Sequence, residues 1–139
     1  MDFENTVTYL LAKLSLAHRN LFERAAVGAG LHSGQAFVLL ELWREDGQRQ
    51  IDLAAKLNLS APTVNKILGG LLENDMVTRG KYENDARSTR IFLTRKGRDV
   101  RGKLEDQWQA LEERTLGGLT DTETLMLHQL LTKLVVEIL

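Results

Sequence analysis

The sequence predicts a mainly α-helical fold with one small antiparallel β hairpin. Apolar residues recur three and four positions apart over most of the chain, and a strand-like alternation appears only between Met76 and Leu93. A single proline and an aromatic content of 6% also favour helices over an all-β fold with many turns. A chain of 139 residues is long enough for one domain with a core and too short for two ordinary ones. We therefore expect a single domain spanning residues 1–139.

The first third of the chain predicts two helices. Apolar residues spaced four and three apart, beginning at Phe3, predict one long helix from Phe3 to Val27, which the Gly28-Ala29-Gly30 segment ends. Ser33 is the expected N-cap of a second helix over Gly34–Arg44.

The middle of the chain predicts a pair of short helices joined by a tight turn. The first covers Ile51–Leu57, after a short extended arm at Gln48–Gln50. The second covers Ala61–Asn74, with Ser60 as its N-cap and a proline in its first turn. Gly69-Gly70 within this helix should each cost about 1 kcal/mol relative to alanine. Close helix packing and close approach to a ligand would both explain the pair, and the sequence leaves both open.

Two strands are expected next, over Met76–Tyr82 and Thr89–Leu93, joined by a polar turn at Glu83–Ser88. Thr94 then caps a long helix, Arg95–Leu116, which Gly117-Gly118 ends. In this order, a helix pair followed by a hairpin is a winged helix-turn-helix.

The final helix is too apolar to lie exposed on a monomer. Thr120 and Glu123 form a predicted capping box at its start. Apolar residues then fill much of it, at Leu125, Leu127, Leu130, Leu131, Leu134, Val135, Ile138 and Leu139. With the broad apolar face of the first helix, this indicates a homodimer formed by the two ends of the chain.

A net charge of −1 conceals a strongly basic segment. Between Met76 and Lys103 there are nine basic and three acidic residues, which gives +6 and leaves −7 for the remainder. A basic face on a neutral protein is typical of nucleic-acid binding, although a solvated helix surface is the alternative.

Residues for catalysis, metal binding or a cofactor are not apparent. The three histidines lie in different predicted elements, and neither a phosphate-binding loop nor a nucleophile motif is present. The absence of cysteine excludes disulfides and thiol chemistry. The sequence has neither a signal-peptide pattern nor an apolar run near the ~18 residues of a membrane span. We therefore expect a cytoplasmic protein that is not an enzyme.

Five motifs in order resemble the MarR family of winged helix-turn-helix transcription regulators. They are Ile51–Leu57, Thr63–Lys66, Met76–Arg79, Asp85–Ser88 and Leu93–Gly97. The resemblance implies a homodimer with dimerisation helices at 1–30 and 117–139, a DNA-binding lobe at 34–94 and a connecting helix at 95–116. It also implies a transcription regulator, a ligand-relieved repressor, bound to a pseudo-palindromic operator in double-stranded DNA.

The candidate DNA contacts lie on the second helix of the pair and on the hairpin. Asn65 carries the donor and acceptor that adenine recognition needs, Lys66 suits a phosphate or a guanine, and Arg87 at the wing tip suits the minor groove. Asp85 either holds the wing through an arginine or only shapes the turn. The full set is Ser60, Thr63, Asn65, Lys66, Arg79, Lys81, Asp85, Arg87, Ser88 and Arg90.

The resemblance further implies a small aromatic or anionic effector bound between the dimer region and the DNA-binding lobe. Candidate lining residues are His18, Phe22, Trp43 and Trp108, although large apolar residues at helical spacing are more often core. The alternative function is a winged-helix protein-interaction module that does not bind DNA.

Overall fold

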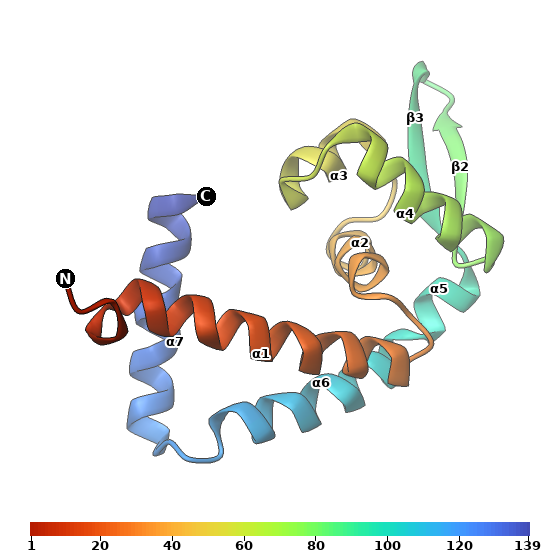
Figure 1. The fold of residues 1–139 in the computed structure, drawn as a ribbon. Coiled ribbons are helices and arrows are strands. Elements are labelled where there is room, and N and C mark those ends of the chain that lie inside the picture. Colours follow the sequence, from red (N-terminus) through yellow and green to blue (C-terminus); the bar gives the residue numbers. More distant parts are fainter.

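The computed structural model describes all residues, 1–139, and confirms a helical fold with one small sheet (Figure 1). The helical elements are a 3-10 turn at Phe3–Asn5, α1 Val7–Gly28, α2 Ser33–Arg44, α3 Gln50–Leu57, α4 Ala61–Glu73, α5 Arg95–Asp99, α6 Arg101–Leu116 and α7 Asp121–Ile138. The strands are β1 Gln48–Arg49, β2 Val77–Tyr82 and β3 Asp85–Leu93, in the order β1-β3-β2 and antiparallel throughout.

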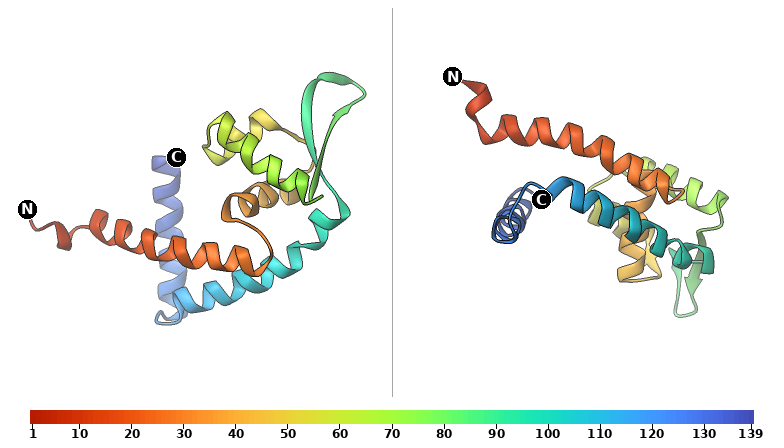
Figure 2. Two further views of the ribbon diagram at one scale, coloured as in Figure 1. Left: turned by 45° about the vertical axis from the view of Figure 1, so that its right-hand side comes forward. Right: turned by 90° about the horizontal axis from the view of Figure 1, so that it is seen from below.

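The molecule has a lobe at one end and a helical arm at the other (Figures 1 and 2). Helices α2, α3 and α4 and the three-stranded sheet form the lobe. Helices α1 and α6 lie side by side and lead away from it, and α7 crosses beyond them (Figure 2). None of the helices combines the length and apolarity needed to cross a membrane.

A single core holds the lobe together. Its largest fully buried side chains include Leu39 and Leu42 of α2, Leu53 of α3, Leu68 of α4 and Ile91 of β3. Burying a leucine or isoleucine side chain contributes about 1.5–3 kcal/mol, so these contacts between elements fix the position of α4. Val64, Leu68 and Leu71 form the buried face of α4.

Two left-handed residues make the turns on either side of α4. Asn58 has φ 53° between α3 and α4, and Asp75 has φ 57° between α4 and β2. Asparagine and aspartate adopt this geometry more readily than other non-glycine residues, which explains their presence at these corners.

Four sequence predictions about element boundaries were wrong in detail. Helix α1 begins at Val7, because Thr6 caps it by accepting from the Tyr9 N–H at 3.2 Å. His32, not Ser33, occupies the N-cap position of α2, where its N–H donates to Gln35 Oε1 at 3.0 Å.

The helix expected over Arg95–Leu116 is two helices that meet at Val100, whose buried side chain joins the core. The hairpin turn is only Glu83-Asn84, so Asp85–Ser88 belongs to β3.

The glycine pair in α4 has two different environments. A Cβ on Gly70 would lie 2.7 Å from Gln35 Nε2 of α2, so close helix packing accounts for Gly70. A Cβ on Gly69 would meet nothing within 4 Å. Packing therefore does not account for Gly69.

Gly97 lies where the hairpin and α5 meet, and it tests this packing. A Cβ at this position would collide with the Met76 carbonyl oxygen, whose backbone cannot move freely. We expect Gly97→Ala to lower the free energy of unfolding by about 1–3 kcal/mol, the usual cost of overpacking. Urea denaturation measures this value.

Gly102→Ala is the matched control, because Gly102 lies in α6 with open space around its Cα. Relief of the glycine penalty should raise stability there by up to about 1 kcal/mol. An equal effect at both positions would contradict the packing described for Gly97.

Candidate nucleic-acid interface and effector pocket

The exposed face of α4 carries the polar residues that the sequence predicts. Thr63, Asn65 and Lys66 are exposed, while Val64 and Leu68 of the same helix are buried. Ser60 begins the helix by accepting from the Thr63 N–H at 3.3 Å, and the two hydroxyl groups lie 2.8 Å apart. These bonds fix the start of α4, and Asn65 and Lys66 in the following turn are exposed.

Asn65 is held from both sides by neighbouring elements. Its Oδ1 accepts from Arg79 Nη2 of β2 at 3.2 Å and from Gln50 Nε2 at the start of α3 at 3.4 Å. The predicted contacts Asn65 and Arg79 are thus brought together. Gln50 was missed, because nothing in its local sequence shows that it faces α4.

The wing is stabilised from within by Asp85. Asp85 Oδ1 accepts from the Arg87 N–H at 3.3 Å, and Asp85 Oδ2 lies 3.6 Å from Arg90 Nη2. The hydrogen bond from the Arg87 backbone is the main cause that holds the pKa of the Asp85 carboxyl below its usual value, and Ser88 and Arg90 add to it. Of the two roles left open, the structure supports Asp85 as a holder of the wing.

Arg90 also faces inward. It donates to the Gly47 carbonyl at 3.0 Å, and its guanidinium lies 4.8 Å from the centre of the Tyr82 ring. Arg90 therefore supports the wing, and its contact with DNA stays a prediction. Arg87, in contrast, is exposed, and it is the third residue of β3 and not the wing tip.

The base of the wing is anchored to the end of α2. Asp46 Oδ1 accepts from the Leu93 N–H at 2.8 Å, and the Trp43 indole N–H donates to the Gly97 carbonyl at 3.0 Å. Thr94 also caps α5, as predicted, by accepting from the Gly97 N–H at 3.0 Å. These bonds join α2, β3 and α5 at a single corner.

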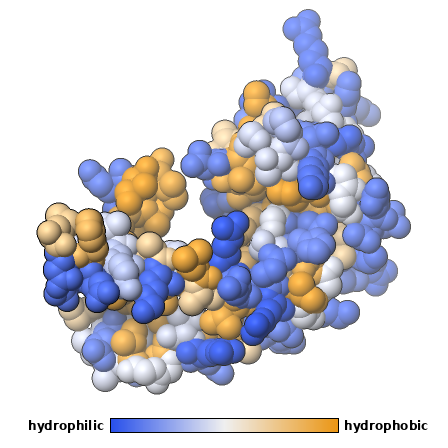
Figure 3. Space-filling model, in the orientation of Figure 1, coloured by the Kyte–Doolittle hydropathy of each residue, from blue (hydrophilic) through white to orange (hydrophobic).

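Four of the cations predicted to contact DNA have no carboxylate partner. They are Lys66 of α4, Arg79 and Lys81 of β2, and Arg87 of β3, and all four are exposed. Arg49, by comparison, is neutralised by Asp52 through bonds of 2.8 and 3.0 Å. Hydrophilic residues also form the tip of the wing in Figure 3. Unpaired cations on a helix and an adjacent hairpin can contact a polyanion.

Ser88, the remaining predicted contact, is half-buried in β3. With Ser60 and Thr63 it contributes hydroxyl groups and no charge, so its role is at most a hydrogen bond.

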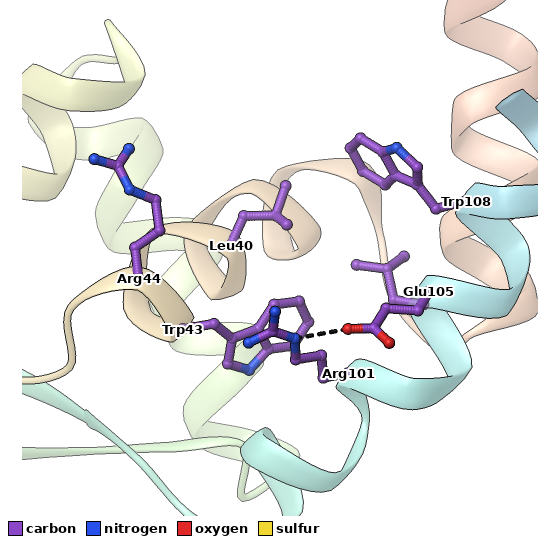
Figure 4. Close-up of a pocket in the computed structure, with 7 residues that line it drawn as sticks. Leu40, Trp43, Arg44, Arg101, Glu105 and Trp108 are labelled. Carbon is purple, nitrogen blue, oxygen red and sulfur yellow. Dashed lines mark hydrogen bonds and ion pairs between the residues drawn. The ribbon is translucent and has the colours of Figure 1, made fainter.

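A pocket of about 330 Å³ lies between α2 and α6 (Figure 4). Two of the four predicted effector residues, Trp43 and Trp108, line it. The Arg101 guanidinium lies over the Trp43 ring, 5.7 Å from its centre. Arg101 Nε lies 2.8 Å from Glu105 Oε1. The complete lining is Leu40, Trp43, Arg44, Arg101, Leu104, Glu105 and Trp108.

The other two predicted effector residues do not line this pocket. Phe22 of α1 contacts the Trp108 ring at 5.3 Å and the Phe37 ring at 5.1 Å, so it supports the wall from behind. His18 is half-buried in α1 and is absent from the pocket. Arg44 and Arg101 were missed, because their helices meet only in the folded chain.

The comparisons with known proteins agree with this geometry. A model of the MarR family matches residues 31–89. The HTH-type transcriptional regulator TtmR of Methylorubrum extorquens (strain PA1) is 35% identical over 86 residues, which are 62% of this chain. The match spans only 42% of TtmR.

Solved structures share the fold over nearly the whole chain. The repressor CouR bound to a 23-mer DNA duplex has a TM-score of 0.88 at 23% identity, covering 96% of this chain and 95% of that one. PcaV of Streptomyces coelicolor with its natural ligand has a TM-score of 0.82 at 21% identity, covering 97% and 95%. Residues 31–89, which hold the winged helix-turn-helix of this chain, therefore match the MarR family.

Proposed function

We propose that this protein is a dimeric, sequence-specific DNA-binding transcription regulator. The observation that carries the proposal is the exposed polar face of α4 beside a hairpin with unpaired cations. A helix of this kind enters the major groove, and a basic hairpin contacts the backbone or the minor groove. Double-stranded DNA is therefore the proposed partner, and the proposed role uses no catalytic group.

The two proposed contact elements, α4 and the wing, have different roles on DNA. Thr63, Asn65 and Lys66 face the bases and the phosphates that border the major groove, while Lys81 and Arg87 lie along the wing. Arg87 suits a narrow A·T-rich minor groove, where the negative potential is strongest. From Thr63 onward the exposed residues of α4 are polar or charged, which favours DNA over the alternative, a protein-interaction module.

Dimerisation through the chain ends explains the exposed apolar residues of the arm. No residue of α7 is buried, although the helix is rich in apolar residues. Each of its apolar residues Leu125, Leu130, Leu134 and Val135 exposes 40% or more of its surface. Figure 3 shows hydrophobic residues gathered over the C-terminal end of α7, apart from the lobe. A second copy of the chain would cover this face together with the start of α1, and it would set the distance between the two α4 helices.

We further propose that this regulator acts in the cytoplasm as a repressor that an effector relieves. The pocket between α2 and α6 is the proposed effector site. Its two tryptophans suit an aromatic molecule, and Arg44 at its edge suits an anionic group. Trp43 also donates to the Gly97 carbonyl, so a ligand that displaced this indole would disturb the junction of α5 and the wing. CouR as a repressor on DNA and PcaV with its natural ligand support the same arrangement here.

Salt dependence tests DNA binding directly. We expect binding to a random duplex to weaken steeply as salt rises, because several counterions are released from the phosphates. Arg87→Ala should weaken binding to every duplex and reduce the slope of log K against log salt by about 1. Fluorescence anisotropy measures both.

Arg114→Ala is the control, since it removes the same charge from α6 on the helical arm. Thermal denaturation should show Arg87→Ala folded, because the side chain is exposed. A flat salt response of the unmodified protein would overturn the proposed function.

Leu134→Glu tests the proposed dimer. A charge in the apolar face of α7 should give monomers or insoluble protein, because the carboxylate would have to be desolvated at the interface. Sedimentation velocity measures the species present. Gln129→Glu lies on the polar face of the same helix and should leave the dimer intact; a stable Leu134→Glu dimer would contradict the assigned interface.

A further inference from the structure

The oxygen of the Asn65 side-chain amide is engaged in hydrogen bonds within the protein itself. Asn65 Oδ1 accepts two hydrogen bonds, from Arg79 Nη2 at 3.2 Å and from Gln50 Nε2 at 3.4 Å. The two donors approach from different elements, β2 and α3, so the oxygen lies between the wing and α3.

These contacts fix which way the amide faces. A guanidinium has only donors, so the atom of Asn65 nearest to Arg79 has to be the oxygen and not the NH₂ group. A carbonyl oxygen has two lone pairs, and Arg79 and Gln50 occupy both. Nδ2 has no partner within the chain, so its two N–H groups are the part of the amide available to DNA.

This arrangement changes the base that Asn65 suits. Adenine recognition by asparagine requires the oxygen to accept from the adenine N6 amino group while the NH₂ group donates to N7. With its oxygen occupied, Asn65 can only donate. In the major groove, guanine offers two acceptors, N7 and O6, whereas adenine offers only one, N7, beside the donor at N6.

We propose that Asn65 recognises its base pair as a donor only and favours a guanine edge, with two acceptors, over an adenine edge, with one. Arg79 and Gln50 are then positioning residues that set this preference through Asn65. The inference rests on the proposed DNA binding and gives it a specificity. It replaces the adenine contact expected from the sequence, where asparagine alone shows both a donor and an acceptor.

Arg79 can still contact a phosphate in this arrangement. Only one of its five N–H donors is used by Asn65, and no carboxylate neutralises its charge. Removing Arg79 should therefore have two separable effects: a uniform loss of affinity from the charge, and a change of base preference from the released oxygen.

The experiment begins with selection of preferred sequences from random duplex by the unmodified protein. Each base pair of the selected site is then exchanged in turn, and the affinity of each duplex is measured. The position whose preference disappears in Asn65→Ala is the one that Asn65 contacts. There we expect a G·C pair to be favoured over an A·T pair by about fivefold, on the scale of one good hydrogen bond.

Two variants then test the positioning role. Arg79→Met combined with Gln50→Leu should shift the preference at that position towards adenine, because the oxygen becomes free to accept. Lys81→Met is the matched control: it removes a wing charge from β2 without touching Asn65, so it should weaken all duplexes equally. Circular dichroism checks folding, and Arg79→Met alone should shift the preference in the same direction.

A preference of the unmodified protein for an A·T pair over a G·C pair at the Asn65 position would overturn the inference, whatever the variants do. An Asn65→Ala variant with unchanged preference at every position would also overturn it. Both results leave DNA binding standing. Absence of salt-dependent binding to random duplex would instead overturn the proposed function, and this inference with it.

Discussion

The structure depends on the anchoring of the wing to the end of α2. Asp46 accepts from the Leu93 backbone, and Trp43 donates to the Gly97 carbonyl. Arg90 adds a bond to the Gly47 carbonyl, which ties the strand to the turn after α2. A two-stranded hairpin is marginally stable alone, so these bonds and the buried Ile91 keep it in place. Because α2 also packs on α4, the helix and the wing are held in one frame.

The same anchor connects the lobe to the arm. Trp43 contributes its N–H to the wing junction and its ring to the pocket between α2 and α6 (Figure 4). One side chain therefore belongs both to the proposed effector site and to the support of the proposed DNA-binding surface. A change at the pocket can reach the wing through a single hydrogen bond, without a long chain of contacts. The two contacts of Trp43 support the proposal of a regulator that an effector relieves.

The sequence predicted those features that depend on local chemistry. The caps Ser60, Thr94 and Thr120 marked the starts of helices, because a cap bonds only to its own turn. Contacts between distant elements could not be predicted in the same way. The division of the connecting helix at Val100 follows from core packing, and the closeness of Gly70 to Gln35 follows from the crossing of α2 and α4. The bonds from Gln50 and Arg79 to Asn65 appear only once three elements are placed together.

In the proposed dimer, two copies of α4 are held at a fixed distance by the joined chain ends. Half-sites for such a dimer lie about 34–36 Å apart, one turn of duplex. The most direct test measures affinity for a two-half-site duplex as about 5 base pairs are inserted between the half-sites, which turns one of them to the opposite face. We predict that affinity falls at least about tenfold, to the level of a single half-site, and recovers in part with a full turn of about 10 base pairs. Affinity independent of the spacing would contradict a fixed pair of DNA-binding lobes.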